Sequence, residues 1–340
     1  MKINQLKDQI DDYEHTVHAI IGFINFYRWS DRDRRMRSDT YVFQGMRLYL
    51  SDHRKAILKD APHHVTPDIA ICRIGGMAVI AEVKKSFPSN NDFWWDNFVQ
   101  LLAYDDDLSG WPTTNSKVAK HDIVLLTHQS RAVAVKRFLD KNADKLAFTR
   151  PFSIVEFNRS DERQPYIFFR KYHGTLAEPE VDAKLEVGVQ VPMNVFVNTY
   201  STVKFYDSPP PLPYMLNMIW THVVLPAASQ QQPTKFQLLR KNQQIDVTLR
   251  VDDIAGRLHE AFSYRQLNAE YHHLQPQLPK REWVLDACRF LVNTQEAAWL
   301  DSNNSELTLF FRRRDDVLEH FIEACSKGQA TSQGEKGLFD

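Results

Sequence analysis

The chain has few cysteines, no long apolar run and almost no net charge. Its 340 residues include three cysteines, Cys72, Cys288 and Cys325, which lie far apart in the sequence. This number and spacing fit reduced thiols in the cytosol, and they argue against a disulfide framework or a zinc site. No apolar run approaches the length of a membrane span, and the N-terminal residues lack the apolar core of a secretion signal. We therefore expect a cytoplasmic protein that does not enter the membrane.

The net charge of the chain is -1, but its two halves differ in their balance of basic and acidic residues. Residues 1–173 contain 26 Lys and Arg against 22 Asp and Glu, whereas residues 174–340 contain 16 against 21. A polyanion would be attracted, weakly, to the first half. The length exceeds what one compact core usually takes, so the chain is expected to form two domains.

Hydrophobic periodicity in residues 1–173 predicts an α/β domain with a mixed sheet flanked by helices. A Gly-Gly pair at 75–76 separates two β-prone runs and indicates a hairpin. Helices are expected at 5–27, 90–108 and 131–147, and strands at 41–50, 68–74, 77–83, 122–127, 153–157 and 166–170.

The second half predicts a smaller α+β domain. Residues 174–233 are expected to form a strand-rich extension, whose strands either extend the sheet or form an interface, followed by a proline-rich linker. Residues 234–327 contain helix and hairpin patterns that resemble a winged helix-turn-helix. The polar tail at 328–340 is expected to be disordered.

Two acids and a lysine near the predicted hairpin carry the strongest chemical signal. Glu82 and Lys84 are two residues apart on one strand, so their side chains project from the same face. The hairpin brings Asp68 beside them. Two carboxylates with a nearby backbone carbonyl, that of Val83, suit a hard cation such as Mg²⁺ or Mn²⁺. An isolated pattern of this kind also fits an exposed hairpin with solvated charges.

The segments Thr66-Pro67-Asp68 and Ala81-Glu82-Val83-Lys84 resemble the PD-(D/E)xK nuclease superfamily over roughly residues 1–170. The resemblance implies a restriction-endonuclease-like fold in which Asp68, Glu82 and the Val83 carbonyl bind the metal. Lys84 would position the attacking water or stabilise charge on the phosphate.

Three further residues are candidates for the same site. Gln100 and Tyr104 are spaced to share one helix face, and they resemble an accessory motif of the RecB-like branch. A core tyrosine is the alternative for Tyr104. Glu14, on the first predicted helix, is expected to complete the acidic set, with a surface helix charge as the equal alternative.

The function expected from this resemblance is a Mg²⁺-dependent endonuclease that cuts DNA, in defence against foreign DNA or in mobile-element processing. One alternative is a catalytically silent nuclease-fold scaffold that binds protein or nucleic-acid partners, and another is an RNA endonuclease. Because double-strand cleavage needs two active sites, we expect a homodimer or a partner protein that docks through the C-terminal half. An arginine-rich turn at 31–37 and the pair Trp94-Trp95 are candidates for nucleic-acid contact, with a solvated turn and a core position as their alternatives.

Overall fold

The computed structural model describes residues 2–28, 40–52, 63–73, 76–84, 91–111, 120–160, 165–193, 203–240, 243–262 and 277–335. The chain divides into two compact units, which are described separately. One unit contains His15–Val203, and the other contains Met1–Glu14, Lys204–Ser263 and Gln277–Asp340. Among the described residues, no helix has both the length and the apolar character needed to span a membrane.

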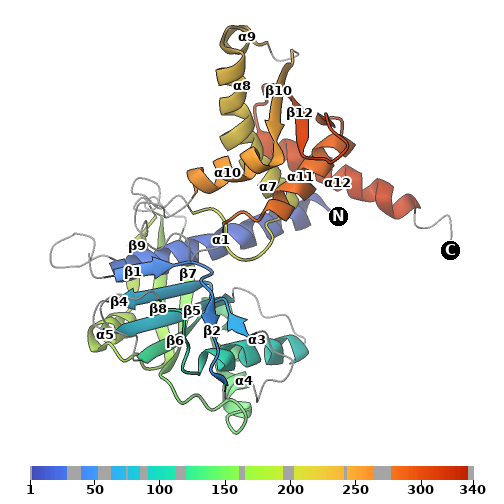
Figure 1. Cartoon of the computed structure of the whole chain (residues 1–340). Coiled ribbons are helices and arrows are strands. Elements are labelled where there is room, and N and C mark those ends of the chain that lie inside the picture. The colour runs from blue at the N-terminus through green and yellow to red at the C-terminus, as the bar shows by residue number, and fades with distance from the viewer. Residues whose placement is uncertain are drawn as a thin grey trace. The chain divides into compact units, whose positions relative to one another are not determined.

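The larger unit is a mixed α/β structure whose curled central sheet is flanked by helices (Figure 1). The seven strands have the order β1-β4-β5-β6-β7-β8-β9. Their bounds are β1 Thr40–Phe43, β4 Ile69–Arg73, β5 Met77–Lys84, β6 Lys120–His128, β7 Phe152–Ser160, β8 Tyr166–Gly174 and β9 Val189–Pro192. Strands β5, β6 and β7 are parallel neighbours, and the remaining pairs are antiparallel. The predicted mixed sheet with flanking helices is therefore confirmed.

The β4–β5 hairpin forms because two β-prone runs meet at a glycine turn. Gly76 has φ +79°, a conformation that favours glycine, and its N–H donates to the Arg73 carbonyl. Ile69 pairs with Ala81 in the resulting register. The predicted strand at 41–50 is interrupted, because Gly45 also has positive φ. Its second part, β2 (Leu48–Tyr49), pairs instead with β3 (His64–Val65).

Helices bury both faces of this sheet. On one face, α3 (Asn91–Tyr104) and α4 (Gln129–Lys141) pack against alternate residues of β4 to β7. On the other face lies the part of α1 (Ile3–Arg28) that belongs to this unit, where Phe23 contacts Phe169 with ring centroids 5.7 Å apart. Since even-numbered residues of β5 face α3, the sheet directs Glu82 and Lys84 toward that helix.

The sheet continues beyond residue 173, where the sequence analysis ended the first domain. Helix α5 (Pro179–Val187) follows β8, and β9 then pairs antiparallel with β8. Of the two roles left open for the strand-prone residues after 174, this strand therefore extends the sheet.

The second unit combines helices with a small antiparallel sheet of order β10-β12-β11. Its later elements are β10 Ile245–Arg250, α10 Val251–Ala261, α11 Arg281–Asn293, β11 Ala297–Trp299, β12 Glu306–Phe311 and α12 Val317–Glu335. The order of helices and hairpin follows the sequence prediction. Helix α12 runs past Lys327 to Glu335, which differs from the disordered tail expected from residue 328.

The expected proline-rich linker differs from the structure. Helical segments run through its second half, namely α7 Leu212–Ile219, the π-helical turn η1 Trp220–Val224, α8 Leu225–Gln231 and α9 Pro233–Leu238. Pro213 lies in the first turn of α7, where a missing N–H costs nothing, so the prolines begin a helix rather than exclude one. Trp220 is buried in this run and stacks on Phe311, with ring centroids 5.9 Å apart.

Candidate active site

The hairpin brings the predicted acids and lysine together at one end of the sheet. Asp68 immediately precedes β4, and Glu82 and Lys84 are close to the end of β5. The pairing of Ile69 with Ala81 places residue 68 opposite residue 82. Both acids are buried, Asp68 being 8% exposed and Glu82 3% exposed. Lys84 Nζ donates to Glu82 Oε1 at 2.7 Å.

Asp68 is held by the backbone of the neighbouring strand. Its Oδ2 accepts the N–H of Val83 at 2.8 Å. The ladder between β4 and β5 stops at Ile69, and the carbonyl of Pro67 accepts from Gly45 instead. The Asp68 carboxylate therefore lies beside the peptide that links Glu82 to Val83.

Helix α3 adds two donors to Glu82. Tyr104 donates its hydroxyl to Oε2 at 2.7 Å, and Gln100 Nε2 donates to Oε1 at 2.9 Å. Gln100 Nε2 also lies 3.1 Å from the Tyr104 hydroxyl. The structure thus brings the predicted Gln100 and Tyr104 to Glu82. Tyr104 is also a fully buried core residue, which supports the core alternative, and its role in the site stays a prediction.

The electrostatics keep Tyr104 a hydrogen-bond donor. Burial is the largest cause raising the pKa of its hydroxyl well above the ordinary value, followed by the charge of Glu82 and the hydrogen bond to it. The charge of Asp68 raises this pKa further, which is consistent with both carboxylates lying near one phenol.

His121 contacts the end of the helix that carries Gln100 and Tyr104, a role that was not predicted from the sequence. Its Nε2 lies 2.7 Å from the backbone carbonyl of Tyr104, at the end of α3. Burial lowers the pKa of His121 to about 4, so a neutral ring donates this bond from Nε2. A single histidine at a strand start carries no sequence signal for such a role.

The donor set fits a hard divalent cation. Asp68 and Glu82 are two buried carboxylates beside one ammonium, and an excess of buried negative charge favours a cation. Among the described residues, no group of three or more His, Cys, Asp and Glu side chains is placed to hold a metal ion. The set predicted here has only two such side chains, because its third ligand is the Val83 carbonyl.

The remaining candidates lie elsewhere or outside the described residues. Glu14 belongs to the other unit, where burial raises the pKa of Tyr214 and the charge of Glu14 raises it further, so the role of Glu14 in the site stays a prediction. Trp94 is buried in the core and contacts Phe138, and Trp95 packs beside it, which supports the core alternative for both. The arginine-rich turn at 31–37 lies outside the described residues.

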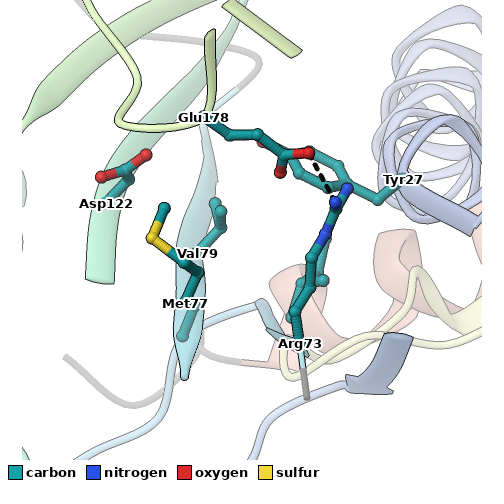
Figure 2. A pocket seen from close by; sticks show the side chains of 8 residues that line it. Tyr27, Arg73, Met77, Val79, Asp122 and Glu178 are labelled. Carbon is teal, nitrogen blue, oxygen red and sulfur yellow. Dashed lines mark hydrogen bonds and ion pairs between the residues drawn. The ribbon is translucent and has the colours of Figure 1, made fainter. Parts of the chain in front are cut away.

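A small pocket lies at the opposite end of the parallel strands. Figure 2 shows the ion pair between Arg73 and Glu178, 2.5 Å long, beside Tyr27, with Asp122 across the pocket. Asp122 Oδ2 accepts the N–H of Ala177 at 2.7 Å. Burial is the main cause that raises the pKa of Asp122 to about 6, and Glu178 adds to it. Asp122 is near the start of β6, whereas Glu82 is near the end of β5, so this pocket is separate from the candidate active site.

Comparison of the chain with protein-family models, with curated proteins and with solved structures finds no match. The functional argument therefore depends on the site itself.

Proposed function

We propose that the chain is a metal-dependent nuclease of the PD-(D/E)xK type that hydrolyses DNA phosphodiester bonds. The observation that carries the proposal is the convergence of Asp68, Glu82 and Lys84, with the ammonium 2.7 Å from the Glu82 carboxylate. The elements of the sheet unit follow the order helix, antiparallel strands, helix, parallel strand. This order supports a restriction-endonuclease-like fold.

Each residue of the site has a chemical task in this proposal. Asp68, Glu82 and the Val83 carbonyl would hold Mg²⁺ or Mn²⁺, which polarises the scissile phosphate and lowers the pKa of a bound water. Lys84, whose ammonium lies 2.7 Å from Glu82 Oε1, would orient the attacking water or stabilise charge on the phosphate. Gln100 and Tyr104 hold the Glu82 carboxylate in one orientation through their hydrogen bonds to its two oxygens.

The second unit, with its winged-helix-like order of elements, is proposed to contact protein rather than DNA. Four basic side chains of α11, its N-cap and the segment after β12 are paired with acids. The pairs are Lys280–Asp207 at 2.6 Å, Arg281–Asp252 at 2.5 Å, Arg289–Asp286 at 3.0 Å and Arg314–Glu296 at 2.6 Å. Neutralised arginines give a weak electrostatic attraction for phosphate, and this supports a partner protein or a second copy of the chain.

A cleavage assay tests the nuclease proposal. Purified full-length protein is incubated with supercoiled plasmid in Mg²⁺, in Mn²⁺ or in EDTA, and nicked and linear products are measured over time. Wild-type protein should cut only with metal. Glu82→Gln and Lys84→Gln should lower the rate by roughly 100-fold or more, because each removes a charge that acts on the reacting phosphate.

Glu180→Gln is the matched control, since it removes an exposed carboxylate that pairs with Lys184 on α5. Its rate should equal that of wild type. In calorimetric titrations with MnCl₂, Glu82→Gln is the one variant of the three that should bind Mn²⁺ more weakly than wild type. Equal cleavage by wild type and both site variants would contradict the proposal, and cleavage confined to single-stranded RNA would select the RNA alternative.

A further inference from the structure

A row of four polar side chains crosses the sheet beside the candidate active site. Lys84 pairs with Thr127, Thr127 with Glu156 and Glu156 with Arg170. They belong to β5, β6, β7 and β8, which are consecutive in the sheet. Paired residues of neighbouring strands project from the same face, so the row continues the face that carries Lys84. With strands about 4.8 Å apart, the Arg170 backbone lies about 14 Å from that of Lys84.

Glu156 and Arg170 form an asymmetric ion pair. Glu156 is 3% exposed, whereas the Arg170 side chain is 46% exposed. Arg170 Nε donates to Glu156 Oε1 at 2.8 Å, and its Nη2 lies 2.6 Å from the same oxygen. A buried carboxylate without such a partner would be costly, so the pair stays formed. One edge of the guanidinium is thereby fixed, and its Nη1 has no hydrogen-bond partner within the described residues.

Thr127 fills the gap between Lys84 and this pair. It is fully buried, and its Oγ1 has no hydrogen-bond partner among the described residues. The hydroxyl is a polar group inside this face, between Lys84 and Glu156, and it is closed off from solvent. The row of polar side chains therefore continues from the candidate active site to Arg170.

We propose that Arg170, held in place by Glu156, binds a phosphate of the DNA strand that enters the active site. This inference rests on the proposed nuclease function. The guanidinium presents planar N–H donors that match phosphate oxygens, and a fixed side chain loses little entropy on binding. A distance of about 14 Å corresponds to a few nucleotides along a DNA strand, so Arg170 contacts a phosphate other than the scissile one.

Binding without cleavage tests this role. The Kd of a fluorescein-labelled DNA duplex is measured by fluorescence anisotropy in EDTA, with full-length protein and at several salt concentrations. Arg170→Gln should weaken binding about 5- to 10-fold and reduce the slope of log Kd against log salt by about one. Arg170→Lys should keep the slope and weaken binding less, because it keeps the charge but not the planar donors.

Two further variants separate a phosphate contact from a structural effect. Lys184→Gln removes a positive charge from α5, where Lys184 pairs with Glu180, and should leave Kd and slope unchanged. The double variant Glu156→Gln/Arg170→Gln removes the ion pair without leaving a buried unpaired acid and without changing net charge. The double variant should bind DNA as weakly as Arg170→Gln. If the single variant unfolds, the double variant still measures the contribution of Arg170 to DNA binding.

The result that overturns the inference is an unchanged Kd and slope in both the single and the double Arg170 variant. Metal-dependent plasmid cleavage by the same preparation would then leave the proposed function standing. The inference is also overturned if Lys184→Gln weakens DNA binding as much as Arg170→Gln does. The effect would then come from the loss of any positive charge rather than from a contact made by Arg170. Wild-type protein that binds no DNA in this assay contradicts the inference directly.

Discussion

Tyr104 links the hydrophobic core to the candidate active site. Its ring is fully buried, and its hydroxyl donates to Glu82 at 2.7 Å. Since a buried phenol needs a partner, the carboxylate and the hydroxyl satisfy each other. The same bond orients the acid that is proposed to hold the metal.

Removal of the Tyr104 hydroxyl should lower the cleavage rate and leave the protein folded. Tyr104→Phe keeps the ring but deletes a hydrogen bond to a charged group, which is worth about 1.5–3 kcal/mol. We expect a cleavage rate about 10-fold or more lower under single-turnover conditions, with the fold intact by circular dichroism. The raised pKa of Tyr104 keeps its proton in place, so wild-type activity should not fall through ionisation of this residue between pH 8 and about 10.

Tyr214→Phe is the control for that change. Tyr214 is equally buried, and its hydroxyl donates to the Lys204 carbonyl at 2.9 Å in the other unit. A similar loss of thermal stability with no loss of cleavage is expected. An equal loss of activity in both variants would show that Tyr104 acts through stability only.

At the scale of elements, each end of the central sheet carries a different group of charges. The end with Glu82 and Lys84 forms the candidate active site. At the other end, Asp122 of β6 accepts the Ala177 N–H and so ties the β8–α5 connection to the sheet. Glu178 and Asp182 are close enough to raise the pKa of Asp122. This second group is therefore expected to affect stability and its pH dependence.

The Asp122 carboxyl should make the fold less stable as pH rises. Its pKa is about 6 in the folded protein and 3.8 ordinarily, so the folded state holds the proton more tightly. Stability should fall between about pH 4 and pH 6 and level off above, by at most about 3 kcal/mol. Asp122→Asn keeps an acceptor for Ala177 and should raise the melting temperature at pH 8, with a smaller gain at pH 5.

Asp140→Asn provides the comparison, because Asp140 is an exposed acid that pairs with Lys136 one helical turn away. It should give no gain in melting temperature at either pH. A gain for Asp122→Asn that does not depend on pH would show that charge burial is not its cause.

At the scale of the whole molecule, helix α1 contributes to both units. Residues up to Glu14 belong to the unit that contains α7 to α12, and residues from His15 belong to the sheet unit. Tyr13 packs against Tyr206 and Tyr214, with ring centroids 4.7 and 5.1 Å apart. Its hydroxyl donates to the Ser208 carbonyl at 3.3 Å. The N-terminal turns are thus part of the second core.

Two substitutions on this one helix should therefore destabilise different units. Tyr13→Ala should cost about 3–5 kcal/mol and lower hydrogen-exchange protection mainly in α7, α10 and α12. Phe23→Ala, at a position that contacts Phe169, should lower protection mainly in β5 to β8. Hydrogen exchange read by mass spectrometry distinguishes the two patterns. The same pattern for both variants would contradict the division into two units.

Much of this protein was determined by its sequence alone. Alternating apolar residues and the Gly-Gly turn predicted the β4–β5 hairpin, because strand pairing across a short turn is a local property. The two-residue spacing of Glu82 and Lys84 put both on one face for the same reason. The four-residue spacing of Gln100 and Tyr104 likewise placed both on one side of a helix.

Only the tertiary structure decided the contacts between distant segments. The row from Lys84 to Arg170 depends on the registers of β5 to β8, and register between separate strands is set by packing rather than by local pattern. The support of Tyr104 by His121 and the contact of Tyr13 with Tyr214 also arise only when separate elements meet. Local geometry can be predicted from residues that are close in the sequence. Contacts between distant segments depend instead on how the complete fold buries apolar surface.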